Sequence, residues 1–344
     1  MNGVSCTMFP PFFTTGIGSL PHTGPDEACR LVFETFDMPF WPQLPGLSFR
    51  ESMIPQFSEG MPSLKVDDLR EAVWIDKDDG DLQRFYEAYS AGWELPISED
   101  YAKGLHAFLR TMQHQHYKFL KGHVTGPLTF TLGLKDADGR LVYFDEELRE
   151  VALIVLKAKI KWQIETLKRH AETVVIFIDE PILSALGSSS YIGVAPEEAL
   201  RLLKETSDAI KESGGIPGIH CCSKADWPLV INSGVHIISF DAYDYIESIA
   251  LYPAEFAGFL RSGRHLAWGI VPTTESIIHE EAHSIGIRFD EGLARLSKSM
   301  PADLLLSQIL LTPSCGTGSR SIEEAVKVFR VLVELKKLLT ERYL

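Results

Sequence analysis

Apolar and polar residues follow one another in this chain as short buried strands separated by longer amphipathic helices. The clearest strand is residues 174–178, a continuous apolar run typical of a sheet that is buried on both faces. Seven further runs have strand character: residues 14–20 and 40–44, and the runs that end at Gly126, Cys222, Asp241, Val271 and Ser314.

Helical segments lie between these strands. Four of them are amphipathic: residues 146–170, 196–211, 254–261 and 321–339. In the last of these, Ile322, Val326, Phe329 and Val333 recur at helical spacing and predict one buried face. Eight strands that are each followed by a helix predict an α/β fold, a (β/α)8 TIM barrel, in a single domain over residues 1–344.

One stretch does not fit the alternation. Residues 58–99 follow the second strand, are rich in Asp and Gly, and are too long for a simple loop. We expect an insertion here that contains a small hairpin and covers the barrel mouth as a lid.

The residues with chemical potential fall where such a barrel places its site. In (β/α)8 enzymes the site forms at the C-terminal ends of the strands. The residues that end or follow predicted strands are Gly18, Ser19, Asp179, Glu180, His220, Cys222, Asp241 and Cys315. Several independent placements of this kind favour one shared site.

A metal site is the first hypothesis for these residues. Side chains alternate along a strand, so His220 and Cys222 face one way and Cys221 faces the other, towards the helices. An imidazole and a thiol side by side are half of a zinc site, and Cys315 with a carboxylate would complete it. Asp241 is the expected carboxylate, with nearby Asp244 as the alternative. The competing interpretation is a packed strand end.

The composition of the chain limits the kinds of molecule that it is expected to bind. The 344 residues carry a formal charge of −14, which argues against nucleic acid because phosphate binding needs a basic face. No apolar run approaches the roughly 18 residues of a membrane span, and no basic start precedes an apolar core as in a secretory signal. Five cysteines, an odd number, do not indicate a disulfide framework. We therefore expect a cytoplasmic protein with reduced thiols and without membrane or nucleic-acid partners.

Several short motifs together resemble a known family. They are His220-x-Cys222, Asp179-Glu180-Pro181, Pro313-Ser314-Cys315-Gly316, Gly16-Ile17-Gly18-Ser19, Arg50-x-x-Met53 and Thr125-Gly126-Pro127. In this order and spacing they resemble the catalytic C-terminal barrel of cobalamin-independent methionine synthase. The resemblance runs from about residue 14 to the C-terminus.

The resemblance implies roles for individual residues. It implies that His220, Cys222 and Cys315 bind zinc, with Asp241 where the family has a glutamate one methylene longer. It also implies that Ile17, Gly18 and Ser19 bind the carboxylate of homocysteine, and that Asp179 binds its amine.

The chain departs from the family on the side of the methyl donor. Gly133 stands where the family has a tryptophan that contacts folate, Ala185 lies near the position of a folate-binding acid, and Thr274 lies near that of a proton-donating histidine. The printed sequence has no counterpart of the family's N-terminal barrel. A second amine-binding glutamate corresponds to Leu47 or Phe49. These departures resemble short relatives that take methyl groups from a corrinoid protein, although His279 in the same loop is an alternative acid.

The sequence thus predicts a zinc-dependent methyltransferase that makes methionine from homocysteine with a methylcorrinoid protein as donor. One alternative keeps the metal and changes the thiol, for example to coenzyme M. Another is a decarboxylase of the uroporphyrinogen type, which would need basic groups, whereas few Arg residues lie near the predicted strand ends. A third is a thiol- or metal-binding protein without catalysis.

Overall fold

A parallel sheet forms the centre of the computed structural model, which describes residues 8–188 and 191–344. Its order is β1, β10, β9, β8, β7, β6, β4. The strand bounds are β1 (Phe13–Thr14), β4 (Tyr117–Thr125), β6 (Ala171–Asp179), β7 (Ile216–Cys221), β8 (Ile237–Asp241), β9 (His265–Val271) and β10 (Ile309–Pro313). Every neighbouring pair is parallel.

Residues 38–43 close this sheet between β1 and β4. The amide of Met38 donates to Thr14 O at 3.0 Å, and the amide of Gln43 donates to Gly18 O at 3.1 Å. On the other side, the amide of Lys121 donates to the carbonyl of Pro39 at 2.8 Å. Proline has no N–H to donate, and Pro39 and Pro42 keep this ladder too sparse for a regular strand. This segment lies where the second strand was expected in chain order. Added to the seven strands of the sheet, it completes the expected (β/α)8 barrel, and the fold prediction is confirmed.

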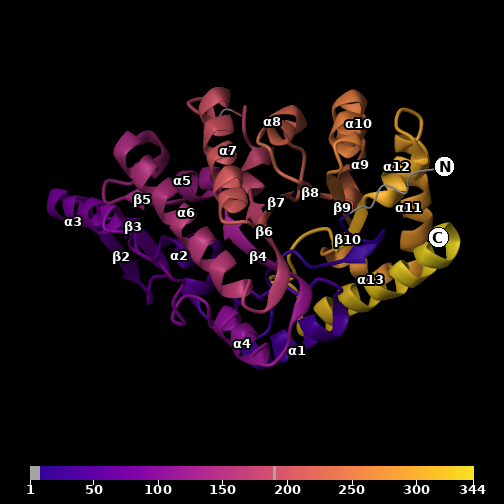
Figure 1. The fold of residues 1–344 in the computed structure, drawn as a ribbon, viewed down its shortest axis with the longest axis horizontal. Helices are drawn as coiled ribbons and strands as arrows, with labels where there is room; N and C mark the ends of the chain where they lie inside the picture. Colours follow the sequence, from indigo (N-terminus) through magenta and orange to yellow (C-terminus); the bar gives the residue numbers. More distant parts are fainter. Residues whose placement is uncertain (1–7, 189–190) are drawn as a thin grey trace.

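Helices follow the strands and surround the barrel (Figure 1). Their bounds are α1 (Pro25–Thr35), α4 (Lys103–Thr111), α5 (Pro127–Gly133), α6 (Glu146–Leu167), α7 (Pro196–Glu212), α8 (Trp227–Asn232), α9 (Ala242–Ala250), α10 (Pro253–Arg261), α11 (Ala282–Leu296), α12 (Ala302–Ser307) and α13 (Ile322–Tyr343), with 3-10 turns η1 (Phe49–Glu51), η2 (Val142–Phe144), η3 (Pro181–Ser184) and η5 (Glu275–His279). Within the described ranges, none of the helices combines the length and the apolar character needed to cross a membrane.

The predicted buried face of α13 is partly wrong. Ile322 and Val326 are 38% and 42% exposed, and Phe329 is buried. The face that packs against the barrel is a longer apolar series: Ala325, Val328, Phe329, Val331, Leu332, Leu335 and Leu339. Two overlapping series at helical spacing occur in this helix, and the one that buries more apolar surface is the one used.

Apolar side chains fill the part of the barrel interior that is farther from the C-terminal ends of the strands. Phe9, Met38, Phe119, Val175, Phe177, Ile237, Ala267 and Leu310 form a buried cluster separate from the larger core under the helices. Four of these residues, Phe119, Ile237, Ala267 and Leu310, lie in the N-terminal halves of their strands. The interior is therefore packed below, and the C-terminal ends of the strands are left for polar side chains.

The insertion contains the expected hairpin. β2 (Leu64–Asp67) pairs antiparallel with β3 (Ala72–Ile75) between α2 (Met53–Ser58) and α3 (Asp79–Ser90). β3 also pairs with β5 (Lys135–Asp136), so the insertion is attached to the segment after α5. Helix α3 and the hairpin lie at the left end of the molecule in Figure 1, far from α11 and α13. A lid function of residues 58–99 stays a prediction.

Candidate metal and substrate site

Three of the predicted metal ligands meet at the barrel mouth. His220 lies near the end of β7, Cys222 directly follows that strand, and Cys315 follows β10. One ligand atom from each side chain lies within 4.8 Å of the other two. Because β8 and β9 separate β7 from β10 in the sheet, this cluster reaches across the mouth.

The imidazole of His220 is held in one orientation. Its Nδ1 lies 3.0 Å from Ser239 Oγ, and Ser239 pairs with His220 across β7 and β8. Its Nε2 is buried and has no hydrogen-bond partner among the residues that the structure describes. A ring fixed through one nitrogen, with the other left free, is the usual arrangement of a metal-binding histidine.

The two thiols of the cluster have pKa values shifted in opposite directions. Cys315 and His220 lower the pKa of Cys222 to about 4, whereas the adjacent Cys222 and burial raise the pKa of Cys315. A thiolate is the form of cysteine that binds zinc. Two sulfurs and a free imidazole nitrogen at this spacing fit a zinc ion.

Asp241 lies at the same mouth but outside this cluster. It ends β8, and its Oδ1 accepts from the amide of Asp244 at 2.9 Å as the N-cap of α9. Burial raises the pKa of Asp241 to about 7, although the charge of His220 lowers it. Asp244 is exposed on α9. Asp241 is thus a carboxylate near His220 whose Oδ1 caps α9.

Cys221 faces away from the cluster, as alternation along the strand predicts. It is 1% exposed, belongs to the core between the sheet and the helices, and its Sγ lies 3.7 Å from the carbonyl of Ser223. Burial raises the pKa of Cys221 to about 12, so its thiol stays protonated. It is a core residue.

The turn after Cys315 packs against Ser19, in the segment that follows β1. The amide of Thr317 donates to Ser19 O at 2.8 Å, and the amide of Gly318 donates to Ser19 Oγ at 3.3 Å. A Cβ added to Gly316 would lie 2.1 Å from Ser19 Oγ, so a larger residue at this position would displace the Ser19 hydroxyl. These contacts place Ser19 next to the loop that carries Cys315 of the candidate metal site.

Asp179 lies beside the same cluster. Its Oδ1 is buried and finds no hydrogen-bond partner in residues 8–188 and 191–344. Burial raises the pKa of Asp179 to about 6, while the charges of His220 and Lys121 lower it and that of Cys222 raises it. The carboxylate is available to a ligand that brings its own donor.

Glu180, next in sequence, is used differently. It is fully buried and accepts from the amides of Leu128 and Thr129, each at 2.8 Å, and from Thr129 Oγ1 at 2.6 Å. A Cβ on Gly126 would lie 2.1 Å from its Cδ. The Thr-Gly-Pro and Asp-Glu-Pro motifs are therefore one unit, in which Glu180 caps α5. Neither Asp179 nor Glu180 forms a salt bridge among the described residues.

The sequence did not lead us to two buried polar residues of β4. Lys121 and His123 lie inside the barrel with Phe119 and Thr125, on one face of the strand, and both are fully or almost fully buried. His123 stacks on Trp41 with ring centroids 3.7 Å apart, and burial holds its pKa well below the usual value. The signal was the alternation itself, which points both side chains inward just before Thr125-Gly126.

The positions where the chain departs from the resembled family can also be located. A Cβ on Gly133 would lie 2.8 Å from Ile54 Cδ1, so α2 occupies the space above this residue. Thr274 is the exposed N-cap of η5, and His279 ends this turn with an exposed side chain.

Comparisons with known proteins give a likeness in structure only. No protein-family model matches the chain, and no curated protein matches it by sequence. A B12-independent methionine synthase from Shewanella sp. W3-18-1, in complex with selenomethionine, superposes with a TM-score of 0.60 over 96% of this chain and 98% of that chain, at 15% identity. A GH113 beta-mannanase from Alicyclobacillus acidocaldarius covers the same shares at 11% identity, with a TM-score of only 0.40.

The first likeness establishes the fold. An identity of 15% says nothing about the chemistry, and the second likeness is too weak to add to the argument. The chain is a single α/β barrel of the TIM type. Its function has to be argued from its own residues.

Proposed function

We propose that this protein is a zinc-dependent methyltransferase that transfers a methyl group to the thiol of homocysteine to give methionine. The observation that carries the proposal is the cluster of His220, Cys222 and Cys315, whose ligand atoms lie within 4.8 Å of one another. Two thiols and an imidazole at the mouth of a barrel are typical zinc ligands.

His220, Cys222 and Cys315 would hold the zinc, with Asp241 as the fourth ligand once its carboxylate leaves the amide of Asp244. Bound zinc supplies a Lewis acid that keeps a substrate thiol as thiolate at neutral pH. These four ligands carry three negative charges, so a site holding Zn²⁺ keeps one net negative charge. Such a site preserves the nucleophilicity of the incoming sulfur.

The rest of the mouth would bind the amino-acid end of the substrate. The free Oδ1 of Asp179 is suited to accept from an ammonium group. The segment from Ile17 to Ser19 lies next to the turn after Cys315 and is suited to hold the carboxylate. Homocysteine has its thiol and its amino-acid group at opposite ends, which matches this division.

A methylcorrinoid protein is the proposed donor. A methyl group on cobalt leaves an electron pair on the metal and needs no proton, whereas a methyl on a folate nitrogen needs an acid to protonate the leaving amine. Gly133, packed under Ile54, offers no aromatic face to a pterin ring, and Thr274 is no acid. The Shewanella protein is described as B12-independent, so the donor is the part of this proposal that most needs an experiment.

The experiment measures zinc content and methionine formation on purified protein. We expect one zinc per chain and methionine from homocysteine with methylcobalamin, faster with a methylated corrinoid protein, and none with methyltetrahydrofolate alone. If methyltetrahydrofolate supports turnover, and if this turnover is lost in His279→Ala, the proposal of a corrinoid donor is wrong. Methylation of coenzyme M in place of homocysteine would keep the metal and change the substrate. A protein without bound zinc would overturn the proposal.

A further inference from the structure

A lysine is fully buried inside the barrel, below the candidate site. Lys121 is 0% exposed, and its Nζ lies 4.6 Å from the ring centroid of Phe177 and 5.2 Å from that of Phe40. Burial lowers the pKa of Lys121 to about 8, although the charge of Asp179 raises it. A buried ammonium costs free energy unless it is paired, so its position calls for a reason.

Its one hydrogen bond within the described residues goes to the segment that follows β1. Lys121 Nζ donates to the carbonyl oxygen of Ile17 at 2.6 Å, across 104 positions of sequence. Ile17 immediately precedes Gly18 and Ser19, and Ser19 is bound from the other side by the turn after Cys315. The short segment 17–19 is therefore held at one end by Lys121 and at the other by the loop that carries a metal ligand.

The same ammonium acts on Asp179. The charge of Lys121 lowers the pKa of this carboxyl and so favours its ionised form against burial. Lys121 lies on β4 and Asp179 on β6, and these strands are paired along their whole length. The ammonium of Lys121 thus binds a backbone segment directly and acts through its charge on a carboxylate whose Oδ1 has no hydrogen-bond partner among the described residues.

We propose that Lys121 is a positioning residue that builds the subsite for the α-amino-acid end of the thiol substrate. Its hydrogen bond to the Ile17 carbonyl fixes the segment from Ile17 to Ser19 for the carboxylate of the substrate, so that the site selects thiols carrying an amino-acid group. The inference rests on the proposed function and adds the origin of its substrate selectivity.

A second buried lysine separates this role from general stability. Lys159 on α6 is also 0% exposed, and its Nζ contacts Glu59 Oε2 at 3.3 Å and the carbonyl of Pro96 at 3.2 Å. Burial lowers its pKa to about 8 as well. It joins α6 to the insertion and contacts no residue of the site, so Lys159→Met is a matched control for Lys121→Met.

The experiment compares two thiols on the zinc-loaded wild type, Lys121→Met and Lys159→Met. For Lys121→Met we expect unchanged zinc content, a KM for homocysteine raised about 10-fold or more, and a kcat within about threefold. Methylation of 2-mercaptoethanol, which lacks the amino-acid group, should be unaffected. Lys159→Met should lower the melting temperature without separating the two thiols.

Equal losses for both thiols, or an unchanged KM for homocysteine, would overturn the inference. If Lys121→Met fails to fold, Lys121→Gln keeps a donor for the Ile17 carbonyl, removes the charge and allows the same comparison. Calorimetric titration of homocysteine into the zinc-loaded proteins separates this inference from the proposed function. A wild type that does not bind homocysteine would overturn both, whereas binding that Lys121→Met retains would overturn only the inference.

Discussion

The two ends of the barrel interior both hold buried histidines, yet they differ in what surrounds them. At the mouth, His220 has a free Nε2 beside two thiols and near two carboxylates. At the opposite end, both ring nitrogens of His265 are buried without a hydrogen-bond partner in the described part of the chain. By the count of free nitrogens, the base of the barrel would be the better site.

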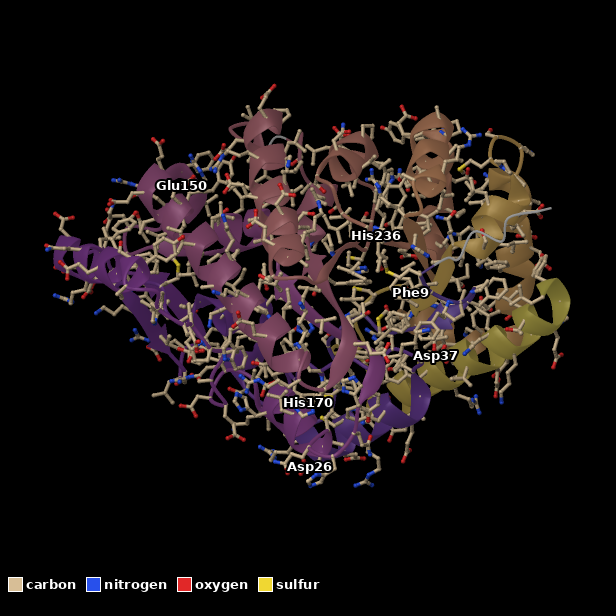
Figure 2. The ribbon with its side chains drawn as sticks, in the orientation of Figure 1. Phe9, Asp26, Asp37, Glu150, His170 and His236 are labelled. Atoms are coloured by element: carbon tan, nitrogen blue, oxygen red, sulfur yellow. The ribbon has the colours of Figure 1, made fainter. Side chains whose placement is uncertain are left out.

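The neighbours of His265 exclude that interpretation. Its ring lies 5.1 Å from that of Phe9 and 5.6 Å from that of His236, which are both labelled near the middle of the molecule in Figure 2. The nearby Arg264 and Lys211 lower the pKa of His236 further after burial has lowered it. A phenyl ring offers no ligand atom to a metal ion and nearby cations repel it, whereas thiolates and carboxylates attract and bind it. A free buried imidazole therefore indicates a metal site only where anionic ligands converge on it.

The largest expected effect tests the mouth. Cys222→Ser should lose most of the zinc, because a serine hydroxyl does not replace a thiolate ligand. Cys221→Ser, one residue away, should keep it, since the Cys221 side chain lies in the outer core. Metal analysis after dialysis against a weak chelator measures both. Full zinc retention in Cys222→Ser and in Cys315→Ser would remove the distinction between the two ends of the barrel.

The same assay distinguishes the two carboxylates. Asp241→Asn should weaken zinc binding, and Asp244→Asn should leave it unchanged because Asp244 is exposed on α9. The reverse result would assign the fourth ligand to Asp244 and leave Asp241 as a helix cap alone.

A smaller effect concerns the substrate side of the mouth. Asp179→Asn should weaken homocysteine binding by roughly 10- to 150-fold, the equivalent of about 1.5–3 kcal/mol for a lost charge-assisted contact. Zinc content should stay unchanged. Isothermal titration with homocysteine and with a simple alkyl thiol measures the difference, and equal affinity for the two thiols in the wild type would contradict the role of Asp179.

The placement of the side chains at the mouth could be predicted from strand periodicity and the barrel fold. The opposite orientations of Cys221 and Cys222 follow from alternation along one strand, and the meeting of His220 with Cys315 follows from the barrel. Contacts between distant segments could not be predicted in this way. The fit of Gly316 against Ser19 and the hydrogen bond from Lys121 to Ile17 depend on barrel closure at an irregular, proline-rich strand.

Two further residues show the limits of local patterns. Asp241 was predicted as a ligand from its position at a strand end, but that position is also the start of α9, and its carboxylate caps the helix. In α13 two apolar series overlap, and only packing decides between them. In both cases the sequence is compatible with two structural roles or two buried faces. A single sequence does not show which of the two the folded protein uses.

The smallest expected effect tests the base of the barrel. Burial and then the charge of His236 lower the pKa of His265 from 6.5 to about 4. Above pH 6.5 this residue is neutral in both the folded and the unfolded chain. Below it, the unfolded chain binds a proton that the folded protein refuses until about pH 4. The free energy of unfolding should therefore decrease as the pH is lowered. His265 alone should account for a decrease of about 2 kcal/mol between pH 7 and pH 5.

His265→Leu removes the titrating group and keeps an apolar side chain against Phe9, so this variant should lose about that much of the pH dependence. Urea unfolding at pH 7 and pH 5 measures it, with the exposed His116→Leu as the control that leaves the slope unchanged. Zinc content should be the same in all three proteins, because the ring contacts described for His265 are with Phe9 and His236, neither of which is an anionic ligand. A pH slope that survives in His265→Leu would mean that His236 or another group takes up the proton, and zinc lost from this variant would show that the two ends of the barrel are coupled.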